Sequence, residues 1–99
     1  MNIKVSSVHF DADKKLLEFV DKKLNKLIKL YEDIIGAEVF LRLENAQDLE
    51  NKVVEIKLLI PGSDLFAKKQ SKSFEESTDI VIEALRQQII KRKDKIRGA

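Results

Sequence analysis

Cysteine is absent from these 99 residues, and proline, glycine and histidine are scarce. Without cysteine the chain cannot form disulfides, thiolate metal sites or cysteine nucleophiles, and its composition fits a reducing compartment. A catalytic dyad or triad based on histidine would have to use His9, the single histidine. We instead expect His9 to be a turn residue between a strand and a helix.

Other absences exclude further classes of active site. The three glycines form neither a Gly-x-x-x-x-Gly-Lys nor a Gly-x-Gly-x-x-Gly pattern, which argues against nucleotide binding by a glycine loop. The serines lack a Gly-x-Ser-x-Gly elbow, and one histidine with scattered carboxylates gives no recognisable metal-ligand spacing. We therefore predict a protein that is not an enzyme and that takes no cofactor, metal or small-molecule substrate.

Long apolar runs are missing as well. No uninterrupted apolar stretch approaches the roughly 20 residues that cross a bilayer, and Met1 to Lys4 opens no signal-peptide pattern. We expect a cytoplasmic protein without a membrane partner.

The chain does contain a foldable mixture of residues. Hydrophobic residues make up 43% of the sequence and charged residues 36%, so it is neither a disordered tail nor a fibrous repeat. A chain of this length can bury one core and is too short for two. We therefore predict a single domain over residues 1–99.

The first third of the sequence predicts a short strand and then an amphipathic helix. The apolar alternation of Ile3 to Val5 is typical of a strand and breaks up at Ser6-Ser7. Asp11 or Asp13 can cap the following helix, and Gly36 can end it. The apolar face of this helix would consist of Leu17, Val20, Leu24, Leu27, Ile28 and Tyr31.

Two longer alternating segments follow. Residues 37–44 and 54–60 alternate between apolar and other residues, which predicts two strands that each bury one face. We expect residues 45–51 to connect them as a hairpin, and Pro61-Gly62 to form the next turn. Leu65-Phe66-Ala67 would begin a short fourth strand, after which residues 68–73 are polar and expected to be exposed.

From Phe74 the apolar period becomes helical again. The residues Phe74, Thr78, Val81, Leu85, Ile89, Arg92 and Ile96 lie within about 40° of one direction. Beyond Ile90 basic residues point all round the axis, so we expect this end to project past the sheet with little packing on its own domain. The order of elements predicts an α+β fold, β-α-β-β-β-α, with two helices packed on one face of a four-stranded, mainly antiparallel sheet.

Charge is distributed unevenly, although the net charge is only +2. Residues 38–60 carry three basic and five acidic residues, whereas residues 86–97 carry six basic residues and one acidic residue. A concentrated cationic element of this kind can attract phosphate even when the whole chain is nearly neutral.

Two groups of basic residues are candidates for a phosphate-binding surface. The lysines Lys15, Lys22, Lys26 and Lys29 fall within about 60° of one another on the first helix, opposite its apolar face. This stripe is equally well explained as the solvated side of an amphipathic helix. The cluster from Lys91 to Arg97 is larger than a helix C-terminus needs, since one or two cations satisfy the helix dipole. If both helices share one sheet face, the stripe and the cluster can form a continuous ridge for folded or double-stranded RNA.

Several motifs also resemble a known family. They are Glu18-Phe19-Val20, Lys23-Leu24-x-Lys26-Leu27, Val53-x-Glu55, Pro61-Gly62, Leu65-Phe66-Ala67 and Leu85-x-x-Gln88-Ile89-x-Lys91-x-Lys93-Asp94-Lys95-Ile96. In this order they resemble the ribosome hibernation promoting factor and ribosome-associated inhibitor A family. One departure is Glu75-Glu76-Ser77-Thr78-Asp79, where many members have Tyr-Ala-Ala-Ile-Asp.

The resemblance implies a partner and a site. Members of that family share a fold similar to the double-stranded RNA-binding domain and block translation from the messenger and transfer RNA channel of the small ribosomal subunit. The resemblance implies that ribosomal RNA contacts basic residues on both helices, at Lys23, Lys26, Lys91, Lys93 and Lys95. With other basic residues of the two helices, the full set of candidates is Lys15, Lys22, Lys23, Lys26, Lys29, Arg86, Lys91, Arg92, Lys93 and Lys95. The chain resembles the short form, which lacks the C-terminal dimerising domain, so pairing of ribosomes stays open.

The sequence leaves two alternatives open. The chain could be a general double-stranded RNA-binding module, although it shows no matching loop signature. It could also be a protein-interaction domain that uses the sheet face carrying Phe40 and Phe66, because each of these residues is out of phase with the apolar partners of its strand.

Overall fold

The elements occur in the predicted order in a computed structural model, which describes residues 2–8, 10–44 and 49–97, with the backbone alone for residues 2 and 94–97. The strands and helices are β1 (Asn2–Val8), α1 (Lys14–Ile28), β2 (Gly36–Leu43), β3 (Lys52–Leu59), β4 (Leu65–Ser71) and α2 (Phe74–Arg97). His9 and residues 45–48 of the expected hairpin connection lie outside the described residues.

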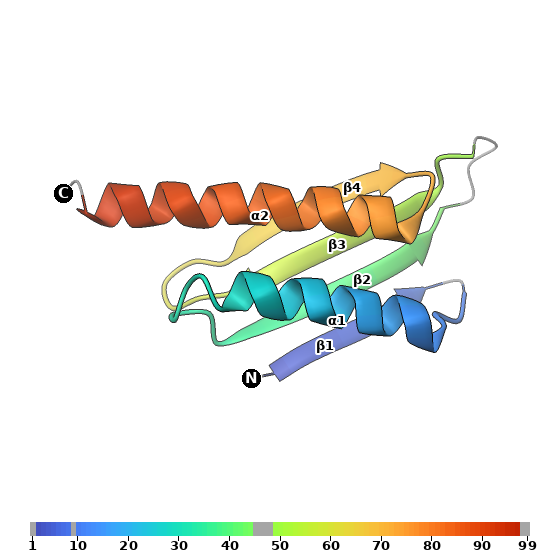
Figure 1. The fold of residues 1–99 in the computed structure, drawn as a ribbon, viewed down its shortest axis with the longest axis horizontal. Coiled ribbons are helices and arrows are strands. Elements are labelled where there is room, and N and C mark those ends of the chain that lie inside the picture. The colour runs from blue at the N-terminus through green and yellow to red at the C-terminus, as the bar shows by residue number, and fades with distance from the viewer. Residues whose placement is uncertain (1, 9, 45–48, 98–99) are drawn as a thin grey trace.

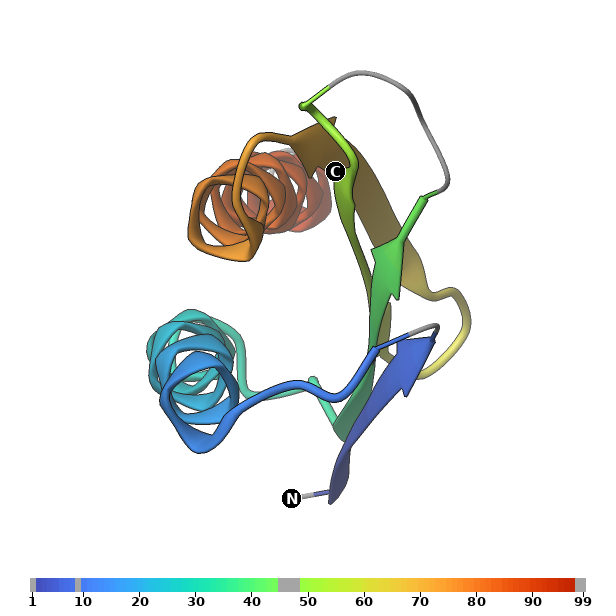
Figure 2. The same ribbon diagram turned by 90° about the vertical axis from the view of Figure 1, so that its right-hand side faces the viewer.

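The four strands form one mixed sheet in the order β1-β2-β3-β4. Strand β1 pairs in parallel with β2, because α1 carries the chain back across the sheet between them, and the other two pairings are antiparallel. Both helices lie on the same face of this sheet, and the opposite face is uncovered (Figure 2). The predicted α+β architecture is therefore confirmed.

The core lies between the helices and the covered face of the sheet. From α1 it receives Leu16, Val20, Leu24, Leu27 and Ile28, and from α2 Val81, Leu85 and Ile89. The inward positions of β2 and β3 alternate as their sequences predict, so that Val39, Leu41, Ile56 and Leu58 are fully buried. This packing holds the two helices side by side, with their outer faces in solvent (Figure 1).

Helix α1 begins as expected and ends earlier. Asp13 is the N-cap, because its Oδ1 accepts a hydrogen bond of 2.8 Å from the Leu16 amide. Gly36 does not end the helix. The last turn tightens instead, with the Leu30 amide bonded to the Leu27 carbonyl, and Gly36 is the first residue of β2. Residues 29–35 thus form a connection that returns the chain to the sheet.

The expected apolar face of α1 needs one change. Leu17 was expected to be buried with Val20 and Leu24, but it is 37% exposed, and Leu16 occupies the buried position in its place. The reason is the placement of the helix on the sheet: Leu17 faces a groove at the β1 edge that it shares with Ile3 and Val5.

Two strands are longer than their side-chain patterns indicated. Strand β1 continues through Ser6-Ser7 to Val8, and β4 continues to Ser71, because backbone pairing with the neighbouring strand does not require apolar side chains. Residues 68–70 are exposed as expected. Ser71 is 3% exposed, which contradicts the expectation for that residue.

Buried hydroxyl groups join the end of β4 to the start of α2. Ser71 Oγ lies 2.6 Å from Ser77 Oγ, and Ser77 Oγ also donates a 2.8 Å hydrogen bond to the Lys52 carbonyl. The neighbouring Thr78 is fully buried, but its Oγ1 has no hydrogen-bond partner among the described residues. Ser73 caps α2 by accepting a hydrogen bond from the Glu76 amide.

Helix α2 is longer than the sheet it covers. Its 24 residues span about 36 Å, whereas an eight-residue strand spans roughly 26 Å. Its C-terminal end therefore extends beyond the turn between β3 and β4 (Figure 1). The expected projection is confirmed, although Arg92 and Lys93 at this end still bind other parts of the domain.

Candidate nucleic-acid interface

The two helices run in the same direction, so their basic C-terminal halves lie at the same end of the molecule (Figure 1). An ion pair of 3.3 Å between Lys23 Nζ and Asp79 Oδ1 joins the middle of α1 to the first half of α2. Further along, Lys93 on α2 donates a hydrogen bond to the carbonyl of Leu30, just after α1. This arrangement places the second half of the lysine stripe beside the second half of α2.

The predicted lysine stripe on α1 is exposed along its whole length. Within the described part of the chain, no ion pair or hydrogen bond engages the side chains of Lys15, Lys22, Lys26 and Lys29. Because a helix rises 1.5 Å per residue, Lys15 lies about 20 Å from Lys29 along the axis. Lys26 and Lys29 therefore lie at the end shared with α2, and Lys15 lies at the opposite end.

A groove of about 320 Å³ lies between the helices, and three of the predicted residues line it. We call it the inter-helix groove. Its lining consists of Lys23, Lys26, Leu27, Leu30, Ile82 and Arg86. Leu30 and Ile82 were not among the sequence candidates. The sequence contains one indication that Leu30 belongs to the groove, namely that it is an apolar residue directly after the lysine stripe. That Ile82 belongs to the groove follows only from the relative placement of the two helices.

Two of the three cations in this groove have acidic partners. Lys23 pairs with Asp79 and also lies 5.5 Å from the centre of the Phe19 ring. Arg86 donates two hydrogen bonds of 2.8 Å to the Glu83 carboxylate. Lys26 is the one groove cation for which the described structure contains no such partner.

The Glu83 carboxylate is strongly stabilised in its charged form. Hydrogen bonds from Arg86, and then from Gln87 at 3.2 Å, lower the pKa of Glu83 to about 2. The same contact raises the pKa of Arg86 above its ordinary value. Both groups therefore stay ionised at neutral pH, and the Arg86 guanidinium is held in one orientation.

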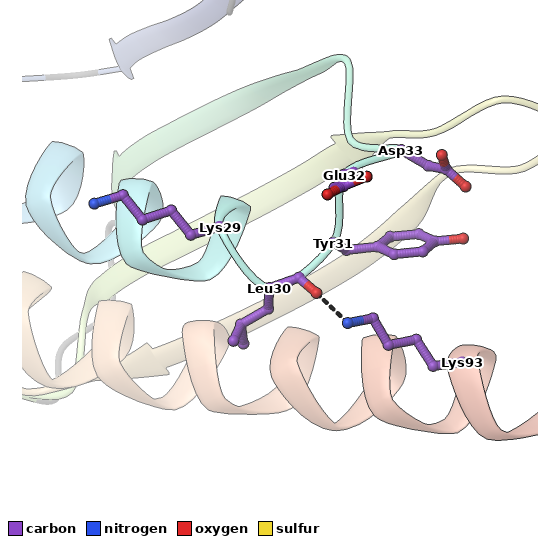
Figure 3. A pocket seen from close by; sticks show the side chains of 6 residues that line it. All are labelled: Lys29, Leu30, Tyr31, Glu32, Asp33 and Lys93. Atoms are coloured by element: carbon purple, nitrogen blue, oxygen red, sulfur yellow. Dashed lines mark hydrogen bonds between the residues drawn. The ribbon is translucent and has the colours of Figure 1, made fainter.

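A second groove, of about 440 Å³, lies where the connection after α1 meets α2. Lys29, Leu30, Tyr31, Glu32, Asp33 and Lys93 line it. Figure 3 shows Lys93 directed at the Leu30 carbonyl, beside the Tyr31 ring, with Glu32 and Asp33 on the connection above. Two lysines and two acids line this groove, so it has no excess of positive charge to attract phosphate.

Arg92 and Lys93 do not behave as free cations. The Arg92 Nε atom donates a hydrogen bond of 3.1 Å to the Tyr31 hydroxyl, and its Nη1 atom donates one of 2.9 Å to Ser63 Oγ. The expectation that the basic end of α2 has little packing on its own domain is therefore wrong for these two residues. Polar acceptors on the α1–β2 and β3–β4 connections are close enough to bind them.

The remaining cations of α2 differ from each other. Lys91 is exposed and makes no hydrogen bond or ion pair with the rest of the described structure. Lys95 belongs to α2, but its side chain lies outside what the structure describes. Among the described side chains, the cations brought to this end with neither a hydrogen bond nor an ion pair are thus Lys26, Lys29 and Lys91.

The uncovered face of the sheet has a different character. Arg42 forms ion pairs with Glu44 at 2.7 Å and Glu55 at 3.3 Å, and Lys68 also pairs with Glu55, at 3.4 Å. The contact with Glu44 is the main reason that the pKa of Arg42 is raised. Cations on this face are largely neutralised by their neighbours, so it attracts phosphate less than the helices do.

Two aromatic side chains emerge between these ion pairs. Phe40 is 37% exposed and Phe66 is 53% exposed. Both point away from the core, in agreement with their position out of phase with the apolar residues of their strands.

Neither a metal site nor a membrane span is evident within the described ranges. Groups of three or more His, Asp or Glu residues that could hold a metal ion do not occur there. The helices that the structure describes are too polar or too short to cross a bilayer.

Comparison with known proteins finds a matching family model and similar relatives. The family model described as "Sigma 54 modulation protein / S30EA ribosomal protein" matches residues 3–97. The chain is 25% identical over 95 residues to a ribosome hibernation promoting factor from Pseudomonas putida, covering 96% of this chain and 89% of that protein. A protein of the same name from Azotobacter vinelandii is 24% identical, with 96% and 85% covered.

Two solved structures share the fold. A ribosomal subunit interface protein from Coxiella burnetii superposes with a TM-score of 0.83 and 22% identity, covering 94% of this chain and 98% of that one. The N-terminal domain of Protein Y from Thermus thermophilus gives a TM-score of 0.76, also at 22% identity, with 90% and 96% covered. At this level of identity the likeness establishes the architecture alone.

Proposed function

The chain belongs to the Sigma 54 modulation protein / S30EA ribosomal protein family, and on this premise we propose that it is a ribosome hibernation factor. It would bind ribosomal RNA of the small subunit in the channel used by messenger and transfer RNA, and so inhibit translation without catalysing a reaction. The names of its relatives from Pseudomonas putida and Azotobacter vinelandii support this role. A ribosomal partner implies a cytoplasmic location.

The observation that carries this proposal is the difference between the two faces of the molecule. On the helical side, Lys22, Lys26, Lys29 and Lys91 are exposed without acidic partners, whereas the sheet face neutralises much of its own charge. A phosphate backbone binds unpaired cations most favourably, because no internal ion pair has to be broken first. The helical side is therefore the face we assign to RNA.

The mechanism we propose is displacement. The described residues form a body with extents of 47 × 25 × 19 Å, elongated along the helices. A body of this size in the channel would exclude messenger and transfer RNA by volume alone. Phosphate contacts would hold it there, and release of counterions from the RNA would supply much of the binding free energy.

A charge-reversal experiment tests the proposal. We expect Lys26→Glu/Lys91→Glu to abolish co-sedimentation with small ribosomal subunits at moderate salt. The matched control is Lys4→Glu/Lys72→Glu, which changes the net charge equally at two exposed lysines that lie on neither helix. Equal loss of binding in both variants would indicate a non-specific charge effect, and retained binding in the first variant would contradict the proposal.

The salt dependence provides a second measurement. For each phosphate contact removed, the slope of log affinity against log salt should become shallower by roughly 0.7 to 0.9. The first variant should therefore lose roughly 1.5 units of slope, and the control should lose none. A general double-stranded RNA-binding module would instead bind any long duplex as well as it binds ribosomes, which a competition assay with duplex RNA measures.

The exposed Phe40 and Phe66 favour protein interaction through the sheet face as a second candidate. Binding by that face would survive high salt and would fail on Phe66→Ser. Binding that is lost at high salt and retained in Phe66→Ser would eliminate it.

A further inference from the structure

The inter-helix groove combines cations with an apolar floor, which a surface for phosphates alone does not require. Leu30 is 42% exposed in the groove, and Ile82 is partly buried beside it. Exposed apolar area next to cations is the combination that recognises an anion carrying an apolar, planar group. Among the components of RNA, a nucleotide with its base removed from the stack has this chemistry.

Arg86 contributes an ordered planar group to the same groove. Its two hydrogen bonds to Glu83 fix the guanidinium plane, and Gln87 donates a further hydrogen bond to Oε1 of the same carboxylate. Because Glu83 already compensates its charge, Arg86 is a weaker phosphate ligand than an unpaired cation. The Arg86 side chain is 43% exposed and lines the groove, and unstacked RNA bases stack on guanidinium planes as they do on aromatic rings.

Lys26 supplies the charge that the nucleotide needs. Lys23 is neutralised by Asp79, whereas Lys26 is exposed and has no acidic partner among the residues described. The groove therefore contains one available cation beside an apolar surface. Its volume of about 320 Å³ leaves room for one nucleobase.

We propose that the inter-helix groove binds a single unstacked RNA nucleotide, with its base on Leu30, Ile82 and the Arg86 plane and its phosphate on Lys26. This inference rests on the proposed RNA-binding function and adds to it a preference for single-stranded or bulged RNA over a continuous duplex. A ridge of phosphate contacts alone would give no such preference.

Three RNA probes test the subsite directly: a single-stranded hexanucleotide, a blunt duplex, and the same duplex with one bulged nucleotide. Binding is measured by fluorescence anisotropy at one salt concentration. We expect Leu30→Ser to weaken binding of the hexanucleotide and the bulged duplex by roughly fivefold, the lower end of what loss of a base–aromatic stacking contact costs, because Leu30 offers apolar contact without an aromatic ring. The blunt duplex should be unaffected. The matched control is Ile80→Ser, since Ile80 is 40% exposed on α2 and does not line the groove.

Methyl NMR spectra of the wild-type protein give a measurement that needs no variant. Addition of the hexanucleotide should shift the methyl signals of Leu30 and Ile82, and should leave those of Leu17, at the β1 edge, in place. Unshifted Leu30 and Ile82 signals at saturating hexanucleotide would overturn the subsite.

The outcomes separate this inference from the proposed function. If Leu30→Ser binds all three RNAs like the wild type while Lys26→Glu/Lys91→Glu loses ribosomes, the subsite is wrong and the proposed function stands. Equal weakening of all three RNAs by Leu30→Ser would also overturn the subsite, because the groove would then make no distinction between paired and unpaired bases. Absence of wild-type binding to both RNA and ribosomes would overturn both.

Discussion

Adjacent residues on α2 have opposite roles in the structure, and this gives a sharp prediction. Arg92 donates hydrogen bonds to Tyr31 and Ser63, which belong to two different connections, whereas Lys91 is exposed and makes no contact of this kind within the described structure. We predict that Arg92→Ala lowers the free energy of unfolding and barely changes RNA binding. Lys91→Ala should do the reverse.

The size of the stability effect follows from the two contacts. A net contribution of about 0.5 to 1.5 kcal/mol per hydrogen bond, taken near its lower end because Arg92 is only partly buried, gives a loss of about 1–2 kcal/mol. For a domain of this length, each kcal/mol corresponds to a shift in Tm of about 4–8 °C. Lys91→Ala should change the free energy of unfolding by less than about 0.5 kcal/mol, as surface substitutions do.

For RNA binding, the larger effect is expected for Lys91→Ala and the smaller one for Arg92→Ala. Lys91→Ala should reduce the slope of log affinity against log salt by roughly 0.7 to 0.9, the share of one phosphate contact. In Arg92→Ala the slope should stay at the wild-type value, because the Arg92 guanidinium is engaged by the domain itself. Urea unfolding and ribosome co-sedimentation across a salt series measure the two quantities on the same three proteins.

A double-mutant cycle identifies the contact responsible. Tyr31→Phe removes the hydroxyl that accepts from Arg92 Nε, so combining it with Arg92→Ala should cost less than the sum of the single changes, by about 1 kcal/mol. The reasoning would be refuted if Arg92→Ala left stability unchanged and lowered the salt slope as much as Lys91→Ala does. Arg92 would then act as a phosphate ligand after all.

Three further predictions concern other contacts. Thr78→Val should stabilise the fold by about 1 kcal/mol in chemical unfolding, because it replaces a buried hydroxyl that finds no partner in the described part of the chain. Ser77→Ala should destabilise the fold by about 1–3 kcal/mol, because it removes a hydroxyl that donates to the Lys52 carbonyl, and destabilisation by both changes would contradict this account. The depressed pKa of Glu83 means that its contribution to stability is complete above its ordinary pKa of 4.5 and is lost as the pH falls through about 2; a carboxyl NMR titration should show this midpoint, which Arg86→Ala should return toward 4.5. Gly62 has a φ of 91°, so Gly62→Ala should cost about 1 kcal/mol in thermal unfolding although nothing lies within 4 Å of the added carbon, and an unchanged Tm would show that the turn relaxes.

Local signals were sufficient to predict most of the elements. The two-residue alternation of residues 37–44 and 54–60, a helix cap at Asp11 or Asp13, and the turn at Pro61-Gly62 all depend on residues a few positions apart, and the structure shows Asp13 to be the cap. Such patterns determine which face of a strand or helix is apolar. These patterns also predicted that the lysine stripe on α1 points to solvent and that Phe40 and Phe66 lie outside the core.

Boundaries depended on more distant residues. Strand β1 continues through Ser6-Ser7 because the backbone of β2 lies beside it, and α1 ends at Ile28, before Gly36, because the chain must return to begin β2. Hydrogen bonding to a neighbouring strand is possible for any non-proline residue, so side-chain composition alone could not locate these ends.

Composition and periodicity by themselves determined the order of elements, the uneven distribution of charge and the helices that carry the cations. Only the tertiary structure decided which cations stay available. Lys23 is neutralised by Asp79 on the other helix, and Arg92 is bound to Tyr31, which lies 61 positions away in the chain. The sequence specifies which residue carries a charge. Whether that residue finds a hydrogen-bonding or acidic partner depends on which distant segment the packed core places beside it. For the same reason the inter-helix groove exists only once both helices are seated on the sheet.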